Sequence, residues 1–230
     1  MSAEQIFLLH VTKVPAILAL VGIFSRRRAH LCWTFVGYLV TVLVCNSLFS
    51  FWPDQFYTRW FWILQQGLLD ALKMGIAVEL SLRTFQAFPG ASATARRMLL
   101  VLLLATSAAL VGMPLHGIDN VVLLEWHPRV LTGTIWLMNG LALLITWYRV
   151  PVHAYHKAIL LGFVPYLLIF ATAVSLFKEH GLMGPLHEFA EPTAYLVLMS
   201  FWAWASWKPD SRPEASPAVV RRLQPWRAHA

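Results

Sequence analysis

The chain contains several apolar runs of about 18 residues or more, the length that an α-helix needs to cross roughly 30 Å of hydrocarbon. Hydrophobic residues make up 58% of the sequence and charged residues only 13%. Long runs separated by short polar segments are typical of proteins that cross a bilayer several times. The sequence therefore predicts an all-α, polytopic membrane protein.

Seven membrane-spanning helices can be drawn, and most of them end at charged residues, Pro or Gly. Pro89 and Gly90 close the third run, and Pro114 ends the fourth. We expect these helices to form one seven-helix bundle within residues 1–207. The predicted helices cover residues 5–24, 31–52, 60–87, 98–115, 130–148, 157–177 and 190–207.

Lys and Arg are unevenly divided between the two ends of this predicted bundle, thirteen against three. Basic residues in short loops mark the cytoplasmic side. We therefore expect the N-terminus outside and the C-terminus in the cytoplasm, with the first apolar run retained as a helix because no basic segment precedes it. The thirteen are Arg26, Arg27, Arg28, Arg83, Arg96, Arg97, Arg149, Lys157, Lys208, Arg212, Arg221, Arg222 and Arg227, and the three are Arg59, Arg129 and Lys178.

The net charge of +7 belongs to these loops and to the tail, so membrane topology accounts for it without a nucleic-acid partner. Residues 208–230 are rich in Pro and charge, and we expect a basic, disordered cytoplasmic tail. Such a tail leaves no room for an output domain, so a signal would have to pass to a separate protein partner. Cys32 and Cys45 lie about 20 Å apart along one predicted helix and cannot form a disulfide with each other.

The third predicted helix carries charges where a membrane helix is normally apolar. Gln66, Asp70 and Lys73 are spaced four and three residues apart, which places them on one face, and Asp70 and Lys73 lie about 15 to 20 Å from the start of the helix. A lone charge at this depth costs about 3 kcal/mol, so the two must face protein, water or each other. The pair is either a ligand or proton site, or an ion pair that fixes helix packing.

Glu79 and Arg83 form a second charged pair on the same helix, four residues apart and near the predicted cytoplasmic end. Glu on the N-terminal side of Arg is the favourable order for a helical ion pair. Glu79 lies on a different face from Asp70, and we interpret Glu79 and Arg83 as a structural ion pair.

Other predicted helices carry polar groups in their outer halves, namely His10 and Lys13 in the first, Trp136 and Asn139 in the fifth and Glu191 at the start of the last. If these faces converge, they line a pocket that opens to the outside above Asp70 and Lys73. Alternatively, Lys13 extends to the membrane surface and Asn139 makes one interhelical hydrogen bond.

The sequence gives little sign of catalysis or of a cofactor. His116, His127, His180 and His187 lie in predicted outer loops and are weak candidates for metal ligands, because none of them shows HxxxH or HExxH spacing. No GxSxG elbow and no P-loop occur, and the last predicted helix has no Lys for a retinal Schiff base. The sequence identifies no cofactor, and it favours a non-enzymatic protein over an enzyme.

Residues 55–97 resemble uncharacterised bacterial seven-helix integral membrane proteins, in the segments QFYTRWFW, AVELSLRTFQAFPG and ARRML. The resemblance implies a multi-pass protein of the bacterial inner membrane. Glu79 matches a glutamate that recurs in this pattern, whereas Asp70 and Lys73 depart from it.

The leading hypothesis is a receptor-like or accessory membrane subunit that binds a small ligand or a partner in its outer half and signals through a separate protein. The alternatives are a proton-coupled transporter or channel, a structural subunit of a larger membrane complex, and an intramembrane metal-dependent enzyme.

Overall fold

A computed structural model describes residues 3–86, 127–147, 152–180 and 191–209. These residues form seven α-helices and one 3₁₀ helix, and no strand occurs among them, so the all-α prediction is confirmed for this part of the chain. The elements are α1 (Ala3–Ser25), the 3₁₀ helix η1 (Ala29–Leu31), α2 (Trp33–Phe51), α3 (Pro53–Phe56), α4 (Arg59–Gln86), α7 (His127–Trp147), α8 (Ala154–His180) and α9 (Glu191–Trp207).

The long helices overlap six of the seven predicted ranges, and the predicted helix at 98–115 lies outside the described residues, as does the tail from residue 210. Two short elements were not predicted. The helix α3 begins with Pro53, whose fixed φ suits the first turn of a helix. The other is η1, which occupies the turn between α1 and α2.

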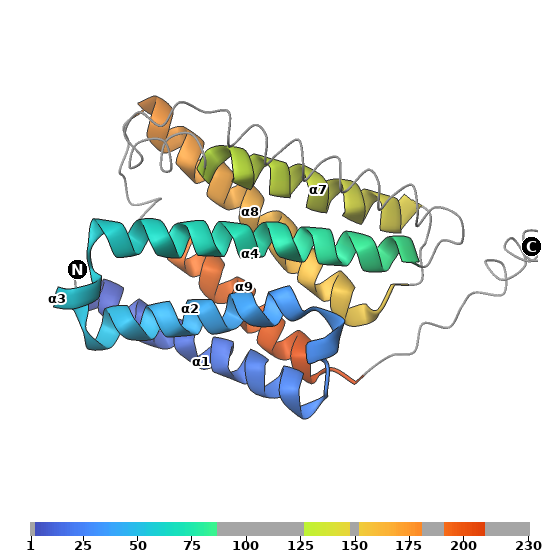
Figure 1. Cartoon of the computed structure of the whole chain (residues 1–230), viewed down its shortest axis with the longest axis horizontal. Coiled ribbons are helices and arrows are strands. Elements are labelled where there is room, and N and C mark those ends of the chain that lie inside the picture. Colours follow the sequence, from blue (N-terminus) through green and yellow to red (C-terminus); the bar gives the residue numbers. More distant parts are fainter. Residues whose placement is uncertain (1–2, 87–126, 148–151, 181–190, 210–230) are drawn as a thin grey trace, which may run out of the picture.

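The six long helices form a closed ring of neighbours. Around the ring the order is α1, α2, α4, α7, α8 and α9, and α9 packs against α1 again. Figure 1 shows these helices lying alongside one another, with α4 between α2 and α7. Each long helix therefore has one side toward two neighbours and the interior, and another side away from the ring.

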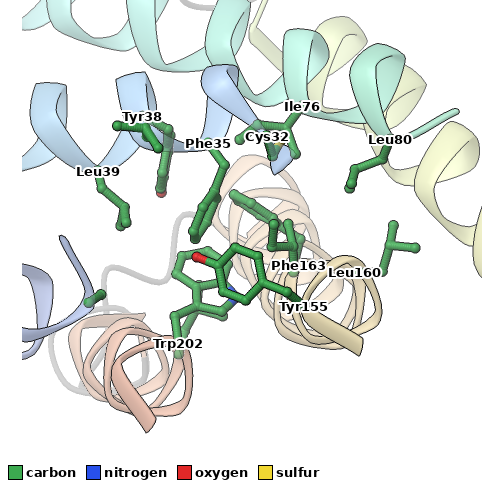
Figure 2. Packing of buried hydrophobic residues seen from close by; sticks show 14 of the residues in the cluster. Cys32, Phe35, Tyr38, Leu39, Ile76, Leu80, Tyr155, Leu160, Phe163 and Trp202 are labelled. Carbon is green, nitrogen blue, oxygen red and sulfur yellow. The ribbon is translucent and has the colours of Figure 1, made fainter. Parts of the chain in front are cut away.

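Aromatic side chains from three helices fill one half of the ring. Phe35 of α2 packs edge-on against Trp202 of α9, with ring centroids 4.8 Å apart, and Phe163 of α8 lies 4.5 Å from Trp202. Tyr38 and Tyr155 pack against the same group. Figure 2 shows the rings of Phe35, Tyr155 and Trp202 converging from their different helices. These contacts connect helices that are distant in sequence and give the bundle its core.

Glycines allow α9 to approach its two neighbours closely. A Cβ atom on Gly22 of α1 would collide with Ser206, and one on Gly162 of α8 would collide with Trp202 and Leu198. Ala16 and Ala19 precede Gly22 at spacings of three residues and are fully buried. Small residues at such spacings let helix backbones come together in a tight interface.

The outward faces of the helices are apolar, whereas several polar side chains are buried. Val14 is 58% exposed, Leu64 67% and Leu161 67%. Asp70, by contrast, is 1% exposed and Arg28 3%. Among the described residues, two stretches are long and apolar enough to cross a membrane, Trp33–Phe51 and Val130–Trp147, and two shorter apolar stretches are His10–Ser25 and Ala154–Phe170.

Two glycines provide a matched test of this packing. We expect Gly162→Ala to lower the free energy of unfolding by about 1 to 3 kcal/mol, because the added methyl group overlaps the Trp202 side chain. Gly140→Ala is the control, since a Cβ there meets nothing within 4 Å, and we expect it to be neutral or to stabilise by up to about 1 kcal/mol. Unfolding in detergent micelles measures both changes, and equal effects of the two substitutions would contradict the close α8–α9 contact.

Candidate functional site

A buried ion pair lies in the middle of α4. Lys73 Nζ donates a hydrogen bond of 3.0 Å to Asp70 Oδ1, and the two side chains are 7% and 1% exposed. Gln66 Nε2 donates to the same carboxylate oxygen over 3.2 Å. The three residues share one face of the helix, as their spacing predicts, and the carboxylate receives a donor from each direction along α4.

An aromatic ring from α8 lies over the ammonium group. Lys73 Nζ lies 5.7 Å from the ring centroid of Phe170 in α8, a cation–π arrangement. The Phe170 ring stacks on Tyr166 at 6.2 Å, and Tyr166 lies 5.8 Å from Tyr195 of α9. The charge on α4 therefore contacts α8 and is connected through ring contacts to α9.

Two tyrosines connect the ion pair to α2 and α9. Tyr38 of α2 and Tyr195 of α9 interact electrostatically with each other, and the Asp70 carboxylate acts on Tyr38. The Tyr195 hydroxyl is buried and makes no hydrogen bond of ordinary geometry. We call the six residues around this point the central cluster: Tyr38, Asp70, Lys73, Tyr166, Phe170 and Tyr195.

The central cluster offers acid–base and hydrogen-bonding groups from four helices of the ring. A carboxylate, an ammonium group and tyrosine hydroxyls can bind a polar group or exchange a proton. Within the described part of the chain, no group of three or more His, Cys, Asp and Glu residues could hold a metal ion. The chemistry available at this point is thus charge neutralisation, hydrogen bonding and aromatic contact.

Other residues from the predicted outer pocket make different contacts. Lys13 Nζ lies over the ring of Phe51, the last residue of α2, 5.0 Å from its centroid. Asn139 Nδ2 donates to the Ile135 carbonyl of its own helix over 3.0 Å. Trp136 is 74% exposed, so its ring points away from the interior of the ring. His10 is exposed on the same helix as Lys13.

Several predicted residues fall where the structure describes no side chain. Glu191 begins α9, His127 begins α7 and His180 ends α8, but only their backbone is described. His116 and His187 lie outside the described residues altogether. The weak histidine candidates for a metal site and the role of Glu191 therefore stay predictions.

Glu79 caps the N-terminus of a neighbouring helix. Its carboxylate accepts hydrogen bonds from the backbone N–H groups of Trp33 at 3.2 Å and Thr34 at 3.0 Å, and from the Thr34 hydroxyl at 2.7 Å. Arg83 Nη2 lies 2.8 Å from Glu79 Oε1 and also donates to the His30 carbonyl. A carboxylate at a helix N-terminus satisfies orphan amides and complements the positive end of the helix dipole.

Arg28 caps the C-terminus of α9. Its guanidinium group donates to the carbonyl oxygens of Ala205 at 3.2 Å and Ser206 at 2.9 Å, and also to that of Lys208. The Arg28 side chain lies over the ring of Tyr155, 5.6 Å from its centroid. A buried cation here neutralises the negative end of the α9 dipole.

Sequence reasoning treated Arg28 as one of three equivalent loop arginines, and it did not identify Tyr38, Tyr166 or Phe170. Nothing in the local sequence separates Arg28 from Arg26 and Arg27, because its partners are about 177 residues away in the chain. Aromatic residues occur in six of the seven predicted helices, and the interior ones become distinct only once the ring order is known.

A double substitution can measure how strongly Asp70 and Lys73 depend on each other. We expect Asp70→Leu or Lys73→Met alone to lower the free energy of unfolding by about 3 kcal/mol or more, because each leaves one buried charge without its partner. The double variant recovers most of this loss, since no buried charge remains. Unfolding in detergent micelles measures the cycle, with exposed Asp54→Leu as the control. Additive losses would show that the two charges are not coupled.

Comparison of the chain with protein-family models, with curated proteins and with solved structures finds no match.

Proposed function

We propose that the chain is a multi-pass protein of the bacterial inner membrane, with its N-terminus outside and its C-terminus in the cytoplasm. The observation that supports a membrane location is that apolar side chains lie on the outside of the bundle and charged side chains lie inside it. Large apolar side chains on all six long helices are exposed, whereas Asp70, Lys73 and Arg28 are buried. In water such an apolar surface would favour aggregation, whereas in a bilayer it contacts the apolar lipid chains.

The two helices that qualify as spans by length and composition add only weak support, because a core helix of a soluble protein passes the same test. Exposed tryptophans add a further argument, since indole prefers the membrane interface. Trp52 and Trp60 lie near the α2–α4 turn, and Trp33, Trp204 and Trp207 lie at the opposite ends of their helices.

Single cysteines can test the orientation. In a chain carrying Cys32→Ala and Cys45→Ala, we expect Asp54→Cys to react with a membrane-impermeant maleimide added to intact cells. Ser25→Cys should react only after the inner membrane is opened, because the α1–α2 turn faces the cytoplasm. Both positions are exposed in the structure, so access to the reagent depends on their side of the membrane. Labelling of both positions from outside would contradict the proposal.

For the activity, we propose a receptor-like or accessory subunit, in which the central cluster responds to a small ligand or a partner helix and a separate protein carries the signal. The observation that carries this proposal is the enclosure of the Asp70–Lys73 pair within a closed ring of helices. Charges in a membrane interior are costly and are normally retained for function. A pair that can be separated or neutralised by a ligand gives the bundle two states of different energy.

Gentle solubilisation tests this proposal. We expect a partner protein or a small-molecule adduct to be recovered in constant ratio with the wild-type chain and to be lost with Asp70→Asn and with Lys73→Met. Asp54→Asn is the matched control, because it neutralises an exposed carboxylate at the outer end of the bundle. Mass spectrometry of the complexes measures the ratio, and size-exclusion profiles establish that each variant is folded. Unchanged recovery with both variants would remove the basis of the proposal.

A second candidate is proton-coupled transport, favoured by Tyr38, which interacts with Asp70, and by Tyr195, which interacts with Tyr38, because the two hydroxyl groups offer steps for a proton. In that case the purified protein in liposomes would move a substrate in response to a pH gradient, and Asp70→Asn would abolish this movement. Recovery of a partner without such uptake favours the receptor-like subunit.

A further inference from the structure

The turn between α1 and α2 is held by side chains from two helices, α4 and α8, and by its own Arg28, which binds a third helix, α9. Arg83 and Glu79 of α4 contact His30 and the first residues of α2. His156 of α8 hydrogen-bonds to the Leu31 carbonyl through Nε2 over 2.9 Å. Arg28, within the turn, binds the end of α9. We call the turn Arg26–Cys32 and the Glu79 and Arg83 side chains together the clasp.

The turn also contains a backbone conformation that its own residues do not favour. Arg27 has φ of 53°, in the left-handed region. The N–H of Arg28 bonds to the Ile23 carbonyl over 2.8 Å, and that of Arg26 to Gly22 over 3.0 Å. This pattern normally ends a helix with Gly at the left-handed position, and an Arg there is less favourable. The contacts that Glu79, Arg83 and His156 make with the turn therefore stabilise this shape.

One helix carries both the central cluster and the clasp. Asp70 and Lys73 lie in the middle of α4, and Glu79 follows Asp70 by nine residues, about 14 Å along the helix axis. No Pro interrupts α4 between these positions. A shift or rotation of α4 at the central cluster must therefore move Glu79 relative to the N-terminus of α2.

We propose that the clasp is a latch that couples the central cluster to the cytoplasmic end of the bundle. When the Asp70–Lys73 pair is disturbed, α4 moves, Glu79 leaves the amides of Trp33 and Thr34, and the turn is released. Exposed Arg26 and Arg27 and the exposed His30 then become available to a partner in a new arrangement. This inference rests on the proposed receptor-like function and names its output element.

The chain contains its own reporter for the latch. Cys32 is 1% exposed, and its thiol donates to Glu79 Oε2 over 3.5 Å. Burial, together with the Glu79 charge, raises the pKa of the Cys32 thiol to about 12, so the closed latch protects the thiol from alkylation. The sequence has one other cysteine, Cys45, and Cys45→Ala leaves Cys32 as a single label site.

The experiment measures the rate of Cys32 alkylation by a maleimide in opened membrane vesicles at fixed pH. We expect slow labelling in the Cys45→Ala chain, and an increase of at least about fivefold when Lys73→Met or Asp70→Asn is added, because labelling follows the population of the open state. Both variants keep Glu79, so the Glu79 charge still acts on the thiol. Glu79→Gln should accelerate labelling further, and Asp54→Asn should not change it.

Three results would overturn the latch: fast labelling of Cys32 in the parent chain, no acceleration by Glu79→Gln, or acceleration by Glu79→Gln without any by the Asp70 and Lys73 variants. If those two variants do not elute as folded protein, Gln66→Leu replaces them, since it removes one hydrogen bond to Asp70 and leaves the ion pair. If the Asp70 and Lys73 variants speed Cys32 labelling but leave recovery of a partner or adduct unchanged, the latch is supported and the proposed function is contradicted. If they abolish recovery but leave labelling unchanged, the proposed function is supported and the latch is contradicted.

Discussion

The ion pair between Asp70 and Lys73 sets conditions that the rest of the bundle meets. Two opposite charges can remain in an interior of low polarity only if they neutralise each other and find further hydrogen bonds or polarisable neighbours. Here Gln66 supplies a second donor, and Phe170 places a ring over the ammonium group. Because Phe170 belongs to α8, the contact requires that α8 be held close to α4, although α7 lies between them in the ring. The closed ring of six helices keeps α4 and α8 at this separation.

Helix dipoles explain the contacts at the other end of the bundle. An anion, Glu79, meets the N-terminus of α2, and a cation, Arg28, meets the C-terminus of α9. Both groups come from outside the helix that they cap, so each contact fixes one element relative to another as well as satisfying backbone groups. Helix ends that are capped by distant side chains resist fraying only while the surrounding bundle stays closed.

The sequence predicts what depends on short-range spacing. Apolar runs located the helices, and the spacings from Gln66 to Lys73 and from Glu79 to Arg83 placed side chains that do contact each other within α4. Contacts between helices could not be predicted, because periodicity shows that a face is apolar and not which neighbour it meets. Trp136 and Asn139 illustrate the limit, since their spacing predicts either a shared pocket or, for Asn139, a hydrogen bond to another helix. Trp136 points outward and Asn139 bonds within its own helix.

The length of α4 has a consequence for its surroundings. At 28 residues the helix is about 42 Å long, which exceeds the roughly 30 Å of hydrocarbon in a typical bilayer. In the proposed membrane setting, α4 must tilt or extend into the headgroup layer, and its tilt depends on the thickness of the surrounding lipid. The distance of Glu79 from the bilayer midplane is therefore a property of protein and lipid together, and a thicker bilayer draws this end of α4 toward hydrocarbon.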